Sequence, residues 1–347
     1  MSLRIRKLKL SGVRQFRDVT FDFTDPETGK PLDRICLIGG NGTGKSTLLR
    51  LLAGPGLLGV PRSRSPLRFD RLRSPSHCEV DLSRDDESIT RGSGSQSNTQ
   101  WFHRVGSEGL EMNSPVDRKT QSEWDSALKE SLAVYCPPDS EAAPVSFADV
   151  PGTSLDQALR LLSEPASKYL VAQDQITAFW SLLIGLVKDR EARLLEYQKR
   201  PENRERKIRE VEEEFLFNNP DILKELAELW APILAKAGLV FDYEKASLPV
   251  QLTDNLKAYI RLLADDSVIP YAELSTGIRA FLFRLGHLFC IFRFHPGKGG
   301  IVLIDEPENS LYPDFQFELL EHYRRAAPDA QMFFATHSPI LAAQFRP

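Results

Sequence analysis

The feature that most constrains the fold of this chain is a glycine-rich stretch at residues 39–47, Gly-Gly-Asn-Gly-Thr-Gly-Lys-Ser-Thr. The apolar run at residues 35–38 before it is typical of a buried strand, and the leucines at residues 48–52 after it suit the buried side of a helix. A strand, a glycine-rich loop and a helix in this order predict a phosphate-binding loop, whereas a chance match in a chain of this length is expected about once in a hundred sequences. The spacing G-x-x-x-x-G-K-[ST] is matched at Gly39, Gly44, Lys45 and Ser46.

The chemistry of such a loop follows from its backbone. Glycines allow a tight turn whose N–H groups point inward, and the N-terminus of the following helix adds partial positive charge. The Lys45 ammonium is expected to reach the outer phosphates of a nucleoside triphosphate, and the Ser46 hydroxyl to ligate Mg²⁺. We predict that the loop binds the nucleotide through Gly39, Asn41, Gly42, Thr43, Gly44, Lys45, Ser46 and Thr47.

The composition of the 347 residues is that of a globular protein. Hydrophobic residues make up 41% of the chain, and 44 basic residues against 48 acidic ones give a net charge of −4, so no global positive field points to nucleic acid. The four cysteines form no C-x-x-C pair, the N-terminus has no signal-peptide core, and the most apolar stretch, residues 281–294, is too short for a membrane span. We therefore expect a cytoplasmic protein that has no membrane segment.

Two carboxylates follow a second strong strand signal. Four aliphatic residues at 301–304, preceded by glycines, predict a central parallel strand that is buried on both faces and ends in Asp305 and Glu306. Ligands of such sheets bind at the carboxyl ends of the strands, so Asp305 is expected to hold Mg²⁺ and Glu306 to activate the attacking water. Taken alone, acidic turn residues after a strand would explain this pattern equally well, and the phosphate loop is what favours catalysis.

Two further motifs fit the same interpretation. Residues 332–335 predict another buried strand, and His337 just beyond it is expected to contact the γ-phosphate from the same sheet edge. Ser275 and Gly277 precede an apolar helix, where they predict a second anion-binding helix start. By itself, the Ser275 pattern is also that of a common N-cap.

The remainder of the chain predicts more strands and a helical region. We interpret residues 91–99 as a hairpin tip, and helical periodicity runs from about residue 155 to residue 236. A charged segment at residues 188–214 is typical of an exposed helical hairpin. Short strands are predicted at residues 3–10, 19–23, 78–82, 132–136, 239–241 and 248–252, and a helix around residues 254–264.

Taken in order, these motifs resemble those of ATP-binding-cassette (ABC) ATPase heads. More narrowly, Ile-Asp-Glu-Pro-Glu-Asn-Ser-Leu-Tyr-Pro at residues 304–313 and Ala-Thr-His-Ser-Pro at residues 335–339 are similar to signatures of the overcoming-lysogenization-defect (OLD)-like, SMC-related AAA family ATPases. Residues 10–16 are similar to the N-F-R-x-F opening of that group, and the resemblance assigns Arg14 to nucleotide binding. The resemblance covers both ends of the chain, and no motif between about residues 61 and 270 matches it.

The resemblance implies an α/β fold, namely a P-loop NTPase of the ABC-ATPase-like head type. Such a head has N-terminal antiparallel strands, a central mostly parallel sheet and an inserted helical subdomain. The expected division is one ATPase core lobe at residues 1–150, a helical insertion at residues 151–265 and a second core lobe at residues 266–347. The chain is expected to end before the C-terminal part of that family.

The resemblance also implies a dimer that forms on ATP. The phosphate loop of one copy would face residues 275–277 of the other copy, with two ATP molecules and Mg²⁺ between them. Lys45 and Glu306 would be catalytic, the latter as the base, His337 would sense the γ-phosphate, and residues 310–311 would form an inter-subunit loop.

Some positions depart from the pattern of the ABC ATPase heads. The signature has Thr276 where Gly or Ser is usual and Ile278 where Glu or Gln often follows. For the glutamine loop, Gln173 and Gln175 are the only candidates near a change of fold, and neither is convincing. We therefore expect hydrolysis that is slow or that depends on a partner.

The function that the resemblance implies is an ATPase whose dimerisation gates a nuclease or toxin effector in anti-phage defence or DNA repair. The alternative is the ATPase subunit of a membrane transporter, which the D-E-P-E and T-H-S-P forms disfavour. A kinase or GTPase would leave residues 275–277 and His337 without a role. A local basic cluster suggests DNA or RNA as a further partner, although a solvated loop explains it at least as well: Arg62, Arg64, Arg68, Arg71 and Arg73.

Overall fold

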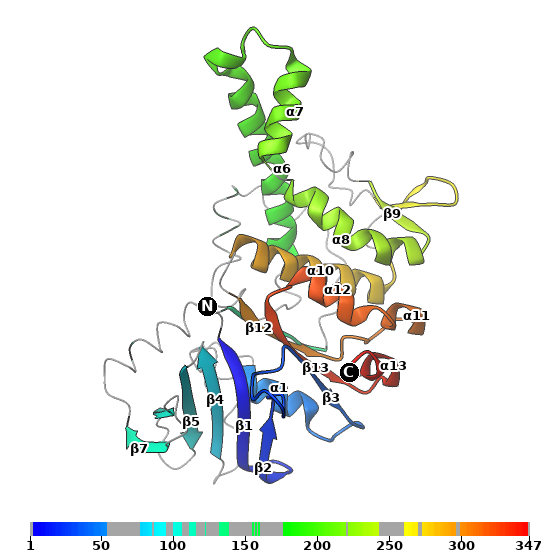
Figure 1. Cartoon of the computed structure of the whole chain (residues 1–347). Helices are drawn as coiled ribbons and strands as arrows, with labels where there is room; N and C mark the ends of the chain where they lie inside the picture. The colour runs from blue at the N-terminus through cyan, green and yellow to red at the C-terminus, as the bar shows by residue number, and fades with distance from the viewer. Residues whose placement is uncertain are drawn as a thin grey trace. The chain divides into compact units, whose positions relative to one another are not determined.

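The computed structural model describes residues 3–53, 77–84, 87–94, 100–105, 111–115, 122, 132–138, 155, 157, 159, 176–219, 221–242, 260–269, 273–295 and 299–345. The chain divides into two compact units, whose helices and strands are labelled in Figure 1. The first unit comprises Met1–Asp139, Lys168–Val171 and Ile291–Pro347, and the second comprises Ser140–Ser167 and Ala172–Cys290. The expected division at residues 150 and 265 stays a prediction.

A four-stranded parallel sheet lies at the centre of the first unit. Its strand order is β3-β13-β12-β8, with bounds Arg34–Ile38, Ala330–Thr336, Gly300–Asp305 and Leu132–Cys136. Every residue of β8, β12 and β13 is buried, which explains the apolar runs in their sequences. The predicted parallel sheet is confirmed, but β3 is less buried than expected, because Ile38 is 60% exposed.

The parallel arrangement brings three strand ends to one edge of this sheet. Asp305 at the end of β12 pairs with Ala335 of β13, and Thr336 at the end of β13 pairs with Ile38 of β3. The loop after β3 leads into helix α1 (Lys45–Ala53), whose leucines are buried as predicted. Three short helices complete this part of the chain: α11 (Pro313–Gln316), α12 (Leu319–Ala326) and α13 (Pro339–Ala343).

A second, antiparallel sheet contains the N-terminal strands (Figure 1). Its order is β2-β1-β4-β5-β6-β7, with bounds Phe16–Asp22, Arg4–Val13, His77–Arg84, Glu87–Gly94, Gln100–Val105 and Glu111–Pro115. The predicted hairpin tip at residues 91–99 is partly wrong, since its first four residues pair with β4 and β6, and residues 95–99 lie outside the described residues.

One hydrophobic core joins the antiparallel sheet, α1 and the parallel sheet. Leu8 and Leu10 of β1 belong to the same buried cluster as Leu49 of α1 and Phe333 of β13. Gln331 adds a buried polar link, because its amide donates to the Ile5 and Leu32 carbonyls at 2.9 Å each and accepts from the Ile5 N–H at 2.7 Å. Such a fully paired amide fixes the position of β1 against β13.

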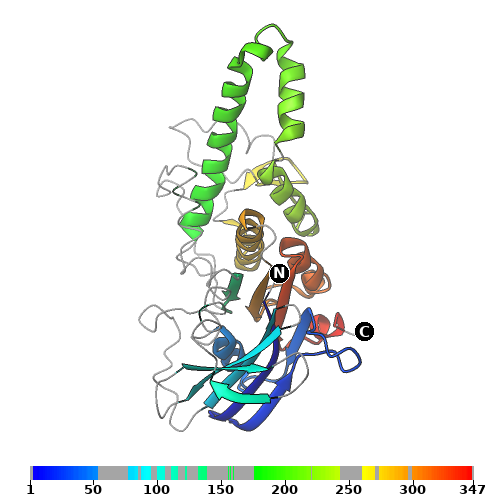
Figure 2. The ribbon, with the colours of Figure 1, turned by 60° about the vertical axis from the view of Figure 1, so that its left-hand side comes forward.

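Helices dominate the described residues of the second unit. Helices α6 (Ile176–Lys199) and α7 (Ile208–Asn218) run side by side in opposite directions, joined through the 3₁₀ turn η4 (Pro201–Asn203) (Figure 2). Polar pairs link the two helices, for example the Tyr197 hydroxyl, which donates to Glu214 at 2.9 Å. The predicted helical hairpin is confirmed.

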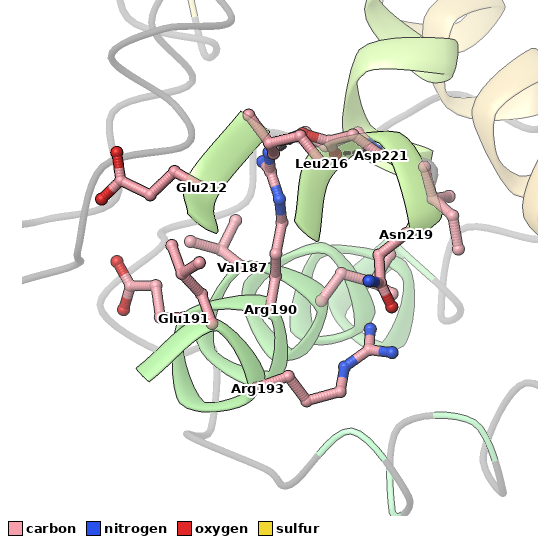
Figure 3. A pocket seen from close by; sticks show the side chains of 12 residues that line it. Val187, Arg190, Glu191, Arg193, Glu212, Leu216, Asn219 and Asp221 are labelled. Carbon is pink, nitrogen blue, oxygen red and sulfur yellow. Dashed lines mark hydrogen bonds and ion pairs between the residues drawn. The ribbon is translucent and has the colours of Figure 1, made fainter. Parts of the chain in front are cut away.

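Helix α8 (Ile222–Lys236) follows this hairpin and is tied to α6 by an ion pair. Arg190 reaches across a cavity of about 330 Å³ to Asp221, as Figure 3 shows. Asp221 is also the N-cap of α8, since its carboxylate accepts from the N–H groups of Leu223 at 3.0 Å and Lys224 at 3.3 Å. One side chain therefore stabilises both the start of α8 and its attachment to α6.

The predicted helix at residues 254–264 is wrong over its described part. Residues Ile260–Leu262 form strand β10, which pairs with β9 (Leu239–Phe241) and β11 (Val268–Ile269) in a small antiparallel sheet. A turn in which Asp266 has a φ of 62° returns the chain from β10 to β11, so strand pairing overrides the helical period. Residues 248–252 lie outside the described residues.

The apolar stretch at residues 281–294 lies in helix α10 (Thr276–Phe294), as predicted. Phe283 and His287 face Phe179 of α6, with ring centroids 5.7 and 6.1 Å away. The indole N–H of Trp230 in α8 donates to the Leu282 carbonyl at 3.1 Å. Among the described residues, no helix is both long and apolar enough to cross a bilayer.

Candidate functional site

Most of the predicted site residues of the first unit line one cavity at the edge of the parallel sheet, while Gly39, Thr43 and Asp305 are not among its lining residues. Its volume is about 390 Å³, and its walls come from segments that are far apart in the sequence. The turn between β1 and β2, the loop after β3, α1, the end of β12 and the end of β13 all contribute. The lining residues are Arg14, Gln15, Asn41, Gly42, Gly44, Lys45, Ser46, Thr47, Arg50, Glu306 and His337.

The loop after β3 adopts a compact turn with its lysine held in place. Gly42 and Gly44 have φ values of 78° and 102°, a region that side chains rarely adopt. The Lys45 ammonium donates to the Gly39 carbonyl at 2.8 Å and the Gly40 carbonyl at 3.0 Å. Because α1 begins at Lys45, the loop places this cation at a helix N-terminus, the geometry that suits an anionic phosphate.

The β1–β2 turn closes over this loop. A methyl group on Gly44 would lie 1.8 Å from Nε2 of Gln15 and 2.7 Å from Cζ of Phe16, and together with the φ of 102° these contacts favour glycine there. Arg14, with a φ of 51°, donates to the Thr47 hydroxyl at 2.9 Å. The structure thus places Arg14 at the site, where the sequence comparison with the OLD-like group put it, and adds Gln15, for which no sequence motif was recognised.

Asp305 lies next to the lining residues Ser46 and Glu306, between two hydroxyl groups. It is fully buried, and its two carboxylate oxygens accept from Ser46 at 3.0 Å and from Tyr135 at 3.2 Å. Burial raises the pKa of the Asp305 carboxyl, and these two hydrogen bonds oppose the rise. A buried carboxylate beside a serine hydroxyl is a set of hard oxygen donors that fits Mg²⁺, and a cation would offset the cost of burying the charge.

Glu306 and His337 line the same cavity from the ends of β12 and β13. Glu306 follows β12 with a φ of 46°, and its backbone N–H donates to the Ala335 carbonyl at 2.9 Å. Its carboxylate lies 4.0 Å from Nδ1 of His337, whose side chain is 49% exposed. A carboxylate and an imidazole at this distance can both reach the same bound group.

Glu308 organises the turn that carries His337, a role that the sequence did not reveal. Its buried carboxylate accepts from the Thr336 hydroxyl at 2.5 Å, from the His337 N–H at 3.0 Å and from the Ser338 N–H at 3.2 Å. The same oxygen lies 3.5 Å from Nδ1 of His337. Glu308 thus fixes the backbone at the end of β13 and the position of the imidazole.

Ser275 and Gly277 are not part of this cavity, because they lie in the second unit. Ser275 precedes α10 and accepts from the Ile278 N–H at 3.4 Å, the geometry of the N-cap that the sequence indicated. Ser275 is exposed and Gly277 is buried. Outside the described residues are both candidates for the glutamine loop and the predicted basic cluster: Gln173, Gln175, Arg62, Arg64, Arg68, Arg71 and Arg73.

Comparison with solved structures supports the fold. A crystal structure of the SmcHead bound to the C-winged helix domain of ScpA aligns with a TM-score of 0.51 and 13% identity, over 98% of this chain and 92% of that one. The SMC head domain from Thermotoga maritima (TM-score 0.44, 14% identity, 98% and 91% coverage) and the recombination mediator RecF (TM-score 0.41, 13% identity, 97% and 93% coverage) are more distant matches. The parallel sheet, the phosphate loop and the SmcHead likeness together define the fold as that of a P-loop, ABC-type ATPase head.

A family of proteins also matches the sequence itself. The AAA ATPase domain family matches residues 108–342, more than half of the chain, and the protein belongs to this family. The match includes the segments of Asp305, Glu306 and His337 but begins after the phosphate loop, so that loop is supported by its own motif and geometry. No curated protein matches the sequence.

Proposed function

We propose that this protein hydrolyses ATP with the help of Mg²⁺ at the cavity of the first unit. The observation that carries this proposal is the convergence of five predicted residues on one sheet edge: Lys45, Ser46, Asp305, Glu306 and His337. Within this arrangement Lys45 binds the outer phosphates, Glu306 orients and deprotonates the attacking water, and His337 contacts the γ-phosphate. Ser46 and Asp305 would hold Mg²⁺, which when bound neutralises negative charge on the phosphates.

The exposure of His337 and Glu306 suggests a second copy of the chain as a partner. His337 is half exposed, and Glu306 lies beside it with 30% of its side chain exposed, so a γ-phosphate near both would remain accessible from outside. The exposed Ser275 at the N-terminus of the 19-residue helix α10 offers a second anion-binding group. We infer an ATP-sandwich dimer in which Ser275 and Gly277 of one copy complete the site of the other.

The OLD-like signatures at residues 304–313 and 335–339 support a more specific role. In that role, ATP-driven dimerisation gates a nuclease or toxin effector in anti-phage defence or DNA repair. The arginines between residues 62 and 73 are the proposed contact to DNA or RNA, and the cytoplasm is the expected compartment. Thr276 and Ile278 depart from the usual signature, so we propose slow or partner-dependent turnover.

A Glu306→Gln variant tests hydrolysis and dimerisation together. Removing the base should stop turnover while ATP still binds, so light scattering should show the mass rising from 39.2 kDa to about twice that value when ATP and Mg²⁺ are added. Lys45→Ala is the matched control, because it should bind nucleotide poorly and stay monomeric. An unchanged mass for Glu306→Gln at saturating ATP would exclude the sandwich dimer, and undiminished turnover would exclude Glu306 as the base.

A further inference from the structure

Tyr135 is a buried tyrosine for which the motif analysis gave no role. It lies in β8, pairs with Leu303 of β12 and is 3% exposed. Buried tyrosine hydroxyls need a hydrogen-bond partner, and the partner here is the carboxylate of Asp305, whose Oδ2 accepts from the hydroxyl at 3.2 Å. The side chain therefore reaches from the strand next to β12 to the carboxylate at the end of β12.

The contacts of Asp305 come from two different directions. Ser46 of α1 donates to Oδ1, and Tyr135 of β8 donates to Oδ2. The guanidinium of Arg50, one helical turn after Ser46, donates to the hydroxyl of Tyr135 at 3.5 Å and lines the cavity. The phenol is the donor in the bond to Asp305, because a carboxylate oxygen accepts.

We infer that Tyr135 is a positioning residue that sets the orientation in which Asp305 meets Mg²⁺, an inference that rests on the proposed ATPase function. The hydrogen bond to Oδ2 leaves the carboxylate little freedom to rotate, and Oδ1 remains directed at Ser46, the other predicted ligand of the metal. Without the hydroxyl, Oδ2 would be a buried acceptor that has lost a partner, and the carboxylate would turn away from the geometry that Mg²⁺ requires.

This inference differs from a purely structural role in what it predicts. If Tyr135 only fills the core, its loss lowers stability but leaves the effect of Mg²⁺ on nucleotide binding unchanged. If it positions Asp305, its loss weakens nucleotide binding only when Mg²⁺ is present. Phenylalanine keeps the ring and removes the hydroxyl alone, so Tyr135→Phe separates the two roles.

The experiment measures the affinity of the full chain for a fluorescent, non-hydrolysable ATP analogue, once with Mg²⁺ and once with EDTA. For Tyr135→Phe we expect the affinity in Mg²⁺ to fall by about tenfold, the loss of one hydrogen bond to a charged group, and the affinity in EDTA to stay within about twofold of the original protein. Tyr197→Phe is the matched control, since it removes a hydroxyl bonded to Glu214 in the second unit and should change neither affinity.

The outcomes separate this inference from the function on which it rests. If the original protein binds the analogue equally well with Mg²⁺ and EDTA, the proposed metal-dependent function fails. If the original protein depends on Mg²⁺ and Tyr135→Phe is identical to it, or is weakened equally in EDTA, only the role of Tyr135 fails. In an Asp305→Asn background, Tyr135→Phe should cause no further change in how the affinity depends on Mg²⁺. If Tyr135→Phe instead lowers the affinity in Mg²⁺ by the same factor in both backgrounds, Tyr135 does not act through Asp305.

Discussion

His287 makes the stability of the second unit depend on pH. The imidazole lies in α10 with no exposed surface, and its ring centroid is 6.1 Å from that of Phe179 and 5.4 Å from that of Phe283. Neither ring nitrogen has a hydrogen-bond partner among the residues that the structure describes. Burial without a counter-charge lowers the pKa of His287 from 6.5 to about 4.

The sign of the effect follows from where the proton binds. Between the two pKa values the unfolded chain takes up a proton at His287 and the folded protein does not, so stability rises with pH in this window and falls as the solution is acidified. The pKa of His287 is about 4 in the folded protein against 6.5 in the unfolded chain. The free energy of unfolding is therefore lower by about 2 kcal/mol at pH 5, and by about 3.4 kcal/mol once the loss is complete below pH 4. Above pH 6.5 the free energy of unfolding keeps the full contribution of the neutral imidazole.

Urea denaturation at pH 7.5 and pH 5.0 measures this loss. Two of the four tryptophans, Trp180 and Trp230, are buried in the second unit with ring centroids 6.4 Å apart and contribute to the fluorescence signal. His287→Leu removes the titrating group, so the difference in the free energy of unfolding between the two pH values should shrink by about 2 kcal/mol relative to the original protein. His295→Leu removes a partly exposed imidazole whose Nδ1 lies 2.9 Å from the Ile291 carbonyl, and this change should not shrink that difference. An equal pH dependence in His287→Leu and the original protein would refute the reasoning.

Two further substitutions test single carboxylates. Glu308→Gln removes the charge that accepts three hydrogen bonds in the His337 turn. Turnover should therefore fall at least about tenfold and the free energy of unfolding by about 1.5–3 kcal/mol, while the affinity for nucleotide in EDTA stays unchanged. Full turnover in this variant would show that the turn does not need the charge. Asp221→Ala removes the N-cap of α8 and the partner of Arg190, so urea denaturation should show a loss of about 2–4 kcal/mol. Asp221→Asn should recover the share that belongs to the cap, and an equal loss in both variants would assign the whole effect to the ion pair.

The sequence predicted the parts of the site that depend on strand ends. The loop at residues 39–47, Asp305 and His337 each follow an apolar run, and parallel strands bring their carboxyl ends to one edge whatever their order in the sheet. Local pattern was therefore sufficient to predict that these groups meet. Local pattern failed at residues 260–262, where pairing with β9 and β11 decided the structure of a short segment.

Tyr135 and Glu308 could not be assigned from the sequence because their roles depend on which strands are neighbours. Tyr135 meets Asp305 only because β8 lies next to β12. The sequence of β8, an apolar strand followed by two prolines, does not indicate which strand is its neighbour. In the sequence, Glu308 belonged to a motif but had no assigned role, because its hydrogen-bond partners lie 28 to 30 residues further along the chain. Sheet order is a tertiary property, so it becomes available only with the structure.

The same neighbour relations give the charged groups of the candidate site partners within the protein. The Lys45 ammonium is satisfied by two loop carbonyls, the Asp305 carboxylate by two hydroxyls, and the His337 turn by Glu308. Each group thus has a partner supplied by the protein, and under the proposed function nucleotide and metal would replace some of these partners in a site that is already built. The side chains of His337 and Glu306 are 49% and 30% exposed, so a group from outside the first unit could contact a phosphate bound beside them. If Ser275 of a second copy is that group, as proposed, hydrolysis becomes conditional on dimerisation, and an isolated chain with a well-ordered phosphate site should turn over slowly.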